Sequence, residues 1–411
     1  MKIDKGWRFR GNELKYIKQV LDAGMGSGTT GSFNMRVEQA FAKKFGVKYA
    51  ITSNSGTSTL HQALMAFGVC PGDEVLVPAL SPIMCGIAPV FAGAKPVFVD
   101  VDKDTFLMDP KDIEKKITKK TKVIMAVNLY GQMCDMSSIM AIARKYNLYV
   151  LEDCAECYLA RDNKGRLAGT VGHIGSFSMQ TTKHITSGDG GILVTNNEKL
   201  AERMRKFGGL GFKHLRADRT KIKKNRDLFQ DPNYQRHDNL GWNYRLSELG
   251  ASVALAQIEK LDWLINKRQQ MARKYLEALD GCSWITPQFL PKDYIHSYYT
   301  FVARYDGLEK RGVSWFDFRK KYIEFGGDGI YSAWVLIYNE PIMKLMSEEG
   351  RFSKDIDGQA TAYKGFLKNN CHCPNAELLQ PKILQFTTNQ NTITEMNKQR
   401  DVLGKTIKYF D

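Results

Sequence analysis

The stretch Ser176-Phe-Ser-Met-Gln-Thr-Thr-Lys183-His-Ile-Thr-Ser-Gly-Asp-Gly-Gly191 places one lysine between small hydroxyl residues and a glycine-rich turn, and an apolar run follows at 192–194. An exposed lysine has a pKa of about 10.4 and stays protonated at neutral pH. A lysine whose hydration is limited can lose its proton and attack a carbonyl carbon. Lys183 is therefore a candidate Schiff-base residue, although a solvated turn lysine would show the same local pattern.

A carboxylate lies in a second segment about thirty residues upstream, Asn147-Leu-Tyr-Val-Leu-Glu-Asp153-Cys-Ala-Glu156-Cys157. Residues 149–151 predict a short buried strand, and Asp153 comes just after its C-terminal end. In an open α/β sheet this end faces the ligand crevice. A carboxylate there can pair with a protonated ring nitrogen, as it does with the pyridine of pyridoxal phosphate (PLP). Asp153 is also a suitable helix N-cap, and the two roles are compatible.

A third segment, Ile51-Thr-Ser-Asn-Ser55-Gly56-Thr57-Ser58-Thr59-Leu60-His-Gln-Ala-Leu64, runs from an apolar strand at 49–51 through hydroxyl residues and glycine into a helical pattern. Backbone N–H groups at a helix N-terminus, with hydroxyls beside them, form an anion site that suits a phosphate. By itself the segment is also compatible with a plain capped helix start. The order of phosphate loop, acid and lysine favours one cofactor site.

These segments resemble the DegT/DnrJ/EryC1/StrS family of sugar aminotransferases, which are fold type I PLP enzymes. The likeness covers roughly residues 30 to 265 and thins beyond about 300. Four further motifs carry it: Gly72-Asp-Glu-Val-Leu-Val-Pro78, Ala92-Gly-Ala-Lys-Pro-Val-Phe-Val-Asp-Val-Asp102, Asn128-Leu-Tyr-Gly-Gln132 and Gly241-Trp-Asn243-Tyr244-Arg245-Leu-Ser-Glu248. The resemblance implies an α/β fold with a large PLP-binding domain over 1–262 and a smaller α+β domain over 263–411.

The resemblance also implies a role for each matching residue. Lys183 would carry PLP as a Schiff base and Asp153 would pair with its pyridinium nitrogen. The remaining matches are Glu156 near the ring hydroxyl, Gly56, Thr57 and Ser178 at the phosphate, and Asn243 at the phosphate of the neighbouring subunit's cofactor. The last match implies a homodimer with shared active sites.

Two positions bear on how the chain compares with the family. Where the family commonly has an aromatic residue on the cofactor ring, this chain has Ser81-Pro82 followed by Ile83-Met84, so an aromatic contact worth about 0.5 to 1.5 kcal/mol is absent. A branch of the family replaces the lysine with histidine and removes a sugar hydroxyl. Because Lys183 aligns with the lysine and His184 follows it, transamination is favoured.

Composition agrees with a globular enzyme. The chain has 411 residues, of which 43% are hydrophobic and 25% charged. Its first residues are polar and no apolar run is long enough for a membrane span, so we expect a cytoplasmic protein and no membrane partner.

The eight cysteines show no disulfide framework. A metal site would need the pairs Cys154–Cys157 and Cys371–Cys373 to meet; buried thiols are the simpler interpretation, and no metal is predicted.

The net charge of +15 is concentrated in part at residues 115–120 and 212–236. The second segment carries Lys213, Arg216, Arg219, Lys221, Lys223, Lys224 and Arg226. Such a surface would attract anionic substrates such as nucleotide-linked or phosphorylated sugars, and a solvated basic loop is an equally good interpretation. Nucleic acid is not expected as a partner, because no nucleic-acid fold is recognisable.

The order of elements predicts a mainly parallel sheet with helices on both faces. Beyond the strands already named, strands are expected at 74–77, 96–101, 123–127 and 192–195, and helices at 112–116 and 136–145. A long amphipathic helix is expected over 247–279. The C-terminal unit would contain a strand at 297–304 and a helix at 316–325.

Two C-terminal features could touch substrate. The stretch Phe325-Gly-Gly-Asp328-Gly-Ile-Tyr331-Ser-Ala-Trp334 has paired glycines and polar side chains that could hold a sugar or a base. A helix end followed by a strand explains the same stretch and is favoured. For His296, too, a structural role is favoured over a catalytic one.

The predicted activity is transfer of an amino group from glutamate or glutamine to a keto-sugar, with PLP as cofactor and a nucleotide-linked sugar as the favoured acceptor. Keto-cyclitols and keto-sugar phosphates are alternative acceptors, and a PLP-dependent deoxysugar dehydratase is the alternative enzyme. A catalytically silent protein of the same fold and a basic nucleic-acid binder are further alternatives. The residues that select the substrate would lie in 212–236 and in the C-terminal part.

Overall fold

The computed structural model describes residues 6–28, 31–218, 227, 230–355, 358–368 and 370–411. One large sheet contains β1 (Tyr49–Ser53), β2 (Glu74–Pro78), β3 (Lys95–Val99), β4 (Thr121–Val127), β5 (Tyr149–Asp153), β6 (Ile174–Ser178) and β7 (Gly191–Thr195). Its strand order is β1-β7-β6-β5-β4-β2-β3. Each strand expected in this part of the sequence is present with ends within two residues of the prediction, and β6 is an additional strand.

The sheet is mainly parallel, as predicted. Strand β7 runs antiparallel to its neighbours β1 and β6, and the other pairs are parallel. Every residue of β6 and β7 is buried, which is typical of strands covered on both faces. Because β6 and β7 are antiparallel neighbours, the loop that joins them, with Lys183 in it, stays at one edge of the sheet.

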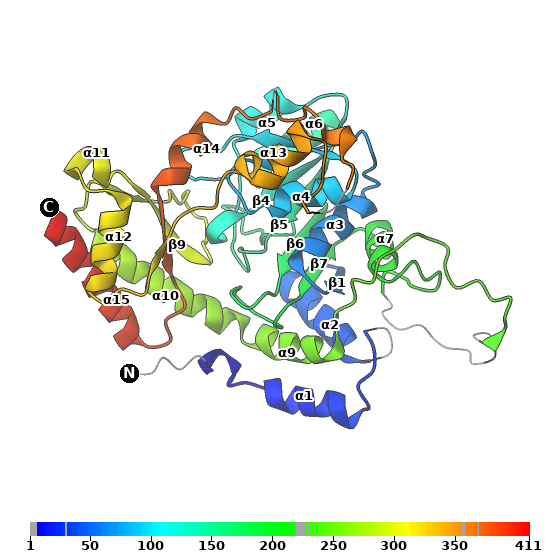
Figure 1. Ribbon diagram of the computed structural model, residues 1–411. Coiled ribbons are helices and arrows are strands. Elements are labelled where there is room, and N and C mark those ends of the chain that lie inside the picture. The colour runs from blue at the N-terminus through cyan, green and yellow to red at the C-terminus, as the bar shows by residue number, and fades with distance from the viewer. Residues whose placement is uncertain (1–5, 29–30, 219–226, 228–229, 356–357, 369) are drawn as a thin grey trace.

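Helices cover both faces of this sheet, and β6 shows the two sides. Successive side chains of a strand point to opposite faces. The Ser176 hydroxyl lies 2.7 Å from that of Thr59 in α3 (Gly56–Ala66), whereas the ring of Phe177 packs 5.1 Å from that of Phe41 in α2 (Phe33–Phe45). The other helices of this part are η1 (Trp7–Phe9), α1 (Glu13–Asp22), α4 (Met84–Phe91), α5 (Pro110–Lys116), η2 (Leu129–Gly131), α6 (Met136–Tyr146), α7 (Glu198–Gly208) and α9 (Glu248–Glu259) (Figure 1).

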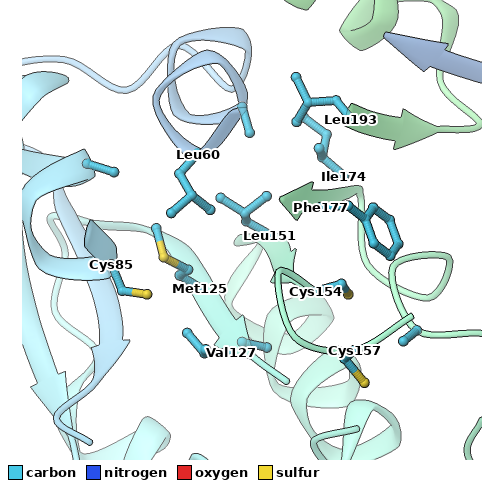
Figure 2. Close-up of a cluster of buried hydrophobic side chains, with 14 of the residues drawn as sticks. Leu60, Cys85, Met125, Val127, Leu151, Cys154, Cys157, Ile174, Phe177 and Leu193 are labelled. Atoms are coloured by element: carbon cyan, nitrogen blue, oxygen red, sulfur yellow. The ribbon is translucent and has the colours of Figure 1, made fainter. Parts of the chain in front are cut away.

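The core beneath the site is apolar. Figure 2 shows Leu60 of α3 facing Leu151 of β5, with Met125 of β4 and Leu193 of β7 nearby, and all four are buried. Complete burial of such a side chain contributes about 1.5 to 3 kcal/mol. This packing gives the loops at the end of the sheet a rigid base.

The C-terminal part has its own sheet and its own hydrophobic cluster, which includes Tyr275, Trp284, Phe301 and Phe386. The strands are antiparallel in the order β10-β11-β9-β8. The elements are α10 (Leu261–Leu279), β8 (Ile285–Pro287), β9 (Thr300–Tyr305), α11 (Gly307–Arg311), α12 (Trp315–Glu324), β10 (Ile330–Tyr331), η3 (Ile337–Asn339), α13 (Pro341–Glu348), η4 (Thr361–Tyr363), α14 (Pro374–Leu379), η5 (Gln380–Lys382), β11 (Ile383–Thr387) and α15 (Ile393–Phe410). The predicted α+β composition is confirmed.

The prediction of a single helix over 247–279 is wrong. Helices α9 and α10 are separated at Lys260, whose φ of −115° and ψ of 17° leave the helical range. The Lys260 ammonium pairs with Glu13 at 2.6 Å, so the break coincides with the attachment of the N-terminal segment. Amphipathic periodicity continues through the break, which is why the sequence pattern did not reveal it.

A segment of the C-terminal part returns to the large sheet. Ile337 and Met343 pack so closely on Gly86 of α4 that a Cβ there would lie 2.5 to 2.8 Å from them. Asn370 accepts a hydrogen bond from Phe98 N at 3.0 Å and donates one to Pro96 O at 2.8 Å, which covers the outer edge of β3. The domain boundary expected after residue 262 stays a prediction. In the ranges given above, every helix is too short or too polar to cross a bilayer.

Candidate functional site

The predicted site residues meet at the carboxyl end of the parallel strands. Asp153 is the last residue of β5, Ser178 is the last residue of β6, and only two residues separate the end of β1 at Ser53 from the start of α3 at Gly56. Strand β5 pairs in parallel with both β4 and β6, so these ends share one edge of the sheet. Ligands of open α/β sheets bind in the crevice outside this edge.

Lys183 projects into a cluster of carboxylates. Its Nζ donates a hydrogen bond to Glu156 Oε1 at 3.1 Å, and the same ammonium lies 4.4 Å from the centre of the Tyr299 ring. Both lysine and glutamate side chains are largely buried. The ammonium is therefore held by one ion pair and one cation–π contact at the edge of the sheet.

The charge state of Lys183 differs from the sequence-based expectation. Burial alone lowers the pKa of Lys183, but the carboxylates of Glu156 and Asp153 and the phenol of Tyr299 outweigh burial and raise the pKa above its ordinary value. The amine is thus protonated at neutral pH in the chain without cofactor. Limited hydration by itself does not set this pKa, because the neighbouring acids decide its direction.

Asp153 is a buried acid with few partners. Its Oδ1 accepts a hydrogen bond from Ala155 N at 3.0 Å, and Cys85 Sγ donates to Oδ2 at 3.4 Å. Burial raises the pKa of Asp153 above its ordinary value, although the N–H of Ala155 and the charge of Lys183 favour the carboxylate. The helix N-cap role is wrong, because turns and bends follow β5 here. A cation beside this carboxylate would stabilise its charged form.

Glu156 connects the lysine to the loop after β4. Its second oxygen, Oε2, accepts a hydrogen bond from Tyr130 N at 3.1 Å. Tyr130 has a φ of 64°, a conformation that is costly for a bulky residue, and its buried hydroxyl has no hydrogen-bond partner among the described residues. Strain of this kind is concentrated at functional sites.

The start of α3 forms the expected anion site. Ser55 caps the helix through a capping box with Ser58, while the N–H groups of Gly56 and Thr57 have no acceptor within the part of the chain that the structure describes. Gly56 faces Ser178 so closely that a Cβ would lie 2.7 Å from the serine Cβ. Two free amides, a hydroxyl and a close backbone approach suit a phosphate.

We expect Gly56→Ala to weaken PLP binding at least about tenfold, because the new methyl group cannot fit against Ser178. Titration of the cofactor-free protein with PLP, followed by absorbance, measures the change. Gly404→Ala is the matched control, since no atom lies within 4 Å of a Cβ at that helical glycine. Unchanged PLP affinity in Gly56→Ala would contradict the assignment of this loop to the phosphate.

The position of the usual aromatic residue is filled by the start of α4. The Ser81 hydroxyl is buried and donates to Pro78 O at 3.0 Å, Pro82 and Ile83 are half-buried, and Met84 is exposed. Cys85 extends from the next position to Asp153. The face near Asp153 is thus bordered by apolar and thiol groups.

His184 bonds to a main-chain carbonyl and not to the carboxylates. Its ring is buried and Nε2 donates to Ser297 O at 3.1 Å, while Nδ1 has no partner among the described residues. Burial lowers the pKa of His184 well below its usual range, so the ring is neutral. The residue at the acids is Lys183, not His184.

Asn243 lies on the exposed surface of the chain. It forms a bridge with Gly209, and the following residue, Tyr244, accepts a hydrogen bond from Asn54 N at 2.8 Å. The motif therefore lies beside the phosphate loop of its own chain. Leu240 and Trp242 next to it are 83% and 57% exposed.

Several other predicted candidates have structural roles. Asp328 accepts hydrogen bonds from Gln390 and Gln399, and His296 bonds to Gln288 and to Tyr298 N. Burial lowers the pKa of His296 to about 3. These contacts support the structural interpretation of both.

The basic segment is described only in part, and the cysteines of the two proposed metal pairs are free thiols. Arg219, Lys221, Lys223, Lys224 and Arg226 lie outside the described residues. Cys154 and Cys157 are buried, and no group of three potential metal ligands occurs within the described ranges.

Three site residues were missed from the sequence, namely Cys85, Tyr299 and Arg8, because each is joined to the site by tertiary contacts alone.

The residues present fit PLP. The raised pKa of buried Asp153 marks a place for a cation such as a protonated ring nitrogen, the free amides of α3 mark a place for a phosphate, and Lys183 supplies an amine. Each of the three features suits a different part of that cofactor.

Comparison with known proteins agrees with a PLP site in this chain. Residues 8–317 match the model of the DegT/DnrJ/EryC1/StrS aminotransferase family. The GDP-perosamine synthase of Escherichia coli O157:H7 is 38% identical over 289 residues, which cover 70% of this chain and 74% of that protein. The GDP-perosamine synthase of Caulobacter vibrioides is 39% identical over 273 residues, covering 66% and 68%.

Solved structures show the same fold. An aminotransferase from Psychrobacter cryohalolentis has a TM-score of 0.83 and 27% identity, with 97% of each chain covered. DesV from S. venezuelae, solved with a ketimine intermediate, has a TM-score of 0.80 and 26% identity over 97% of this chain and 95% of that one. The resemblance drawn from the motifs is confirmed: the chain belongs to the DegT/DnrJ/EryC1/StrS aminotransferase family and is a PLP-dependent sugar aminotransferase.

Proposed function

We propose that this enzyme moves an amino group from glutamate or glutamine to a keto-sugar linked to a nucleoside diphosphate, with GDP as the first candidate. The observation that carries the catalytic assignment is the position of Lys183 Nζ, 3.1 Å from Glu156 and in the electrostatic field of Asp153. The names of the relatives, which are GDP-perosamine synthases, support the choice of nucleotide. The net charge of +15 supports an anionic substrate.

PLP supplies an aldehyde that bonds to amines and a ring that accepts the electron pair left when a proton leaves the adjacent carbon. Lys183 is the group assigned to hold the cofactor and, once its amine is free, to move that proton. Asp153 would keep the ring nitrogen protonated. Gly56 and Thr57 would bind the phosphate through their amides, and Ser178 through its hydroxyl.

Glu156 has a separate task in this mechanism. Its Oε1 holds the ammonium of Lys183 at 3.1 Å, and its Oε2 is fixed by Tyr130 N. Glu156 would therefore stabilise the protonated amine of Lys183 whenever that amine is not bonded to the cofactor. A carboxylate fixed in this way orients the amine as well as balancing its charge.

The dehydratase alternative requires a histidine in place of the lysine. The buried ring of His184 bonds to Ser297 O, whereas Lys183 bonds to Glu156. The geometry therefore favours transamination.

We infer that the enzyme acts as a homodimer with shared sites. Asn243 is exposed in the single chain, and the neighbouring side chains of Leu240 and Trp242 are exposed apolar groups suited to an interface. In a dimer Asn243 would contact the phosphate of the partner's cofactor. A cytoplasmic location remains an expectation from the sequence alone.

We expect the PLP-loaded enzyme to transfer ¹⁵N from labelled glutamate or glutamine to a GDP-linked keto-sugar, with a kcat/KM at least about tenfold above that for the same sugar without nucleotide. Mass spectrometry of the products measures both reactions, and UDP- and dTDP-linked ketones test the choice of base. Loss of a hydroxyl without incorporation of nitrogen would identify the dehydratase instead. Amination of keto-cyclitols alone would contradict the proposed acceptor.

A further inference from the structure

An arginine from the N-terminal segment binds the backbone that carries the lysine. Arg8 lies in η1, far from Lys183 in sequence, and its guanidinium donates three hydrogen bonds to this turn. Its NH1 reaches Thr181 O at 3.1 Å, and its NH2 reaches Lys183 O at 2.6 Å and His184 O at 3.0 Å. The part of the chain that the structure describes offers no other donor to the Lys183 and His184 carbonyl oxygens.

The segment that carries Arg8 is itself fixed on the protein. The rings of Trp7 and Trp263 pack edge-to-face with centres 5.5 Å apart. The carbonyl oxygen of Arg8 accepts hydrogen bonds from Gln257 Nε2, at 2.8 Å, and from Lys260 Nζ. Helices α9 and α10 therefore hold the arginine from one side while it holds the lysine turn on the other.

A second arginine completes the support. Arg268 of α10 is buried and donates to Tyr299 O at 2.7 Å, to Thr388 Oγ1 at 3.0 Å and to Thr182 O at 3.3 Å. The ring of Tyr299 contacts the Lys183 ammonium. The two guanidinium groups thus bind consecutive carbonyl groups of an irregular loop and the aromatic residue against which the lysine rests.

We propose that Arg8 is a positioning residue that holds the main chain of Lys183, so that the amine returns to one place after each proton transfer. The inference rests on the proposed role of Lys183. The turn has neither helix nor strand geometry, so its carbonyl groups depend on side-chain donors to stay in place. A displacement of about 1 Å at a reacting group costs about 100-fold in rate. An arginine offers several donors in a planar fork that a lysine cannot reproduce.

Two measurements on Arg8→Met and Arg8→Lys test this role. In the loaded enzyme we expect Arg8→Met to lower kcat about 10- to 100-fold while the KM values of both substrates change less than about threefold. Arg8→Lys should fall between Arg8→Met and the wild type, and added guanidinium ion should restore part of the kcat of Arg8→Met. In the cofactor-free chain, amide hydrogen exchange over 179–187 should become at least about tenfold faster in Arg8→Met.

The control is Lys15→Met, which removes an exposed cation from α1 and should keep the wild-type kcat and exchange rates. Wild-type kcat or unchanged exchange over 179–187 in Arg8→Met would overturn the proposal. A lower kcat with faster exchange throughout the chain and no effect of added guanidinium would also overturn it. In that case Arg8 would support only the fold. Turnover retained in Lys183→Ala would instead refute the role of Lys183, and the exchange data on the cofactor-free chain distinguish the two failures.

Discussion

Lys183→Ala should lower turnover at least about 10³-fold, because the variant loses both the amine that bonds to PLP and the base that moves the proton. The absorbance band of lysine-bound PLP should disappear, while PLP itself can still bind through the loop at Gly56. The fold should survive, since the lysine side chain lies at the edge of the sheet and contributes little to the core. Steady-state amination assays and absorbance spectra of the variant measure these effects.

Two controls make this result specific. Lys164→Ala removes an exposed lysine from the loop between β5 and β6 and should keep the wild-type rate. Small primary amines added to Lys183→Ala should restore some proton transfer, and more basic amines should do so better. Retained turnover in Lys183→Ala would contradict the assigned role.

Asp153→Asn should bind PLP yet transaminate about 10²- to 10⁴-fold more slowly. An amide cannot stabilise a protonated ring nitrogen as a carboxylate does, so the ring becomes a poorer electron acceptor. Burial raises the pKa of Asp153 even though the charge of Lys183 acts on it, which indicates that a further positive charge beside this acid would stabilise its carboxylate. Single-turnover absorbance changes after addition of glutamate measure the chemical step directly.

Asp135→Asn is the matched control for this change. Asp135 caps α6 by accepting a hydrogen bond from Ser138 N, and asparagine caps helices equally well. The same substitution should therefore leave the rate unaltered there. A rate for Asp153→Asn within about twofold of the wild type would remove the acid from the mechanism.

Much of the large sheet could be predicted from sequence because its strands are short buried apolar runs between turn residues. Strand β6 could not, since Ile174-Gly-Ser-Phe-Ser178 contains small and polar residues that lack a strand pattern. The buried hydroxyl of Ser176 finds its partner in Thr59 of α3, far away in the sequence. Strand β6 therefore depends on tertiary hydrogen bonds that its own sequence does not indicate.

The site could be predicted only in part, for a related reason. The motifs indicated the residues that meet PLP, and the structure brings Lys183 next to Glu156 as those motifs imply. Cys85 and Arg8 were missed because they are 68 and 175 positions away from their partners Asp153 and Lys183. No local pattern marks such a contact.

The pKa of Lys183 could not be predicted from the local sequence either. Small neighbours in the sequence suggested a poorly hydrated and therefore acidic amine. In the folded chain, acids from the segment at 153–156 lie against it and reverse the direction. The sign of a pKa shift depends on charges that only the fold brings together.

The most direct test of the account is to reduce the PLP-loaded enzyme with borohydride and locate the added mass by peptide mass spectrometry. We expect one modified lysine, Lys183, in the peptide that contains the loop between β6 and β7. Modification of a different lysine, or no stable adduct at all, would contradict it.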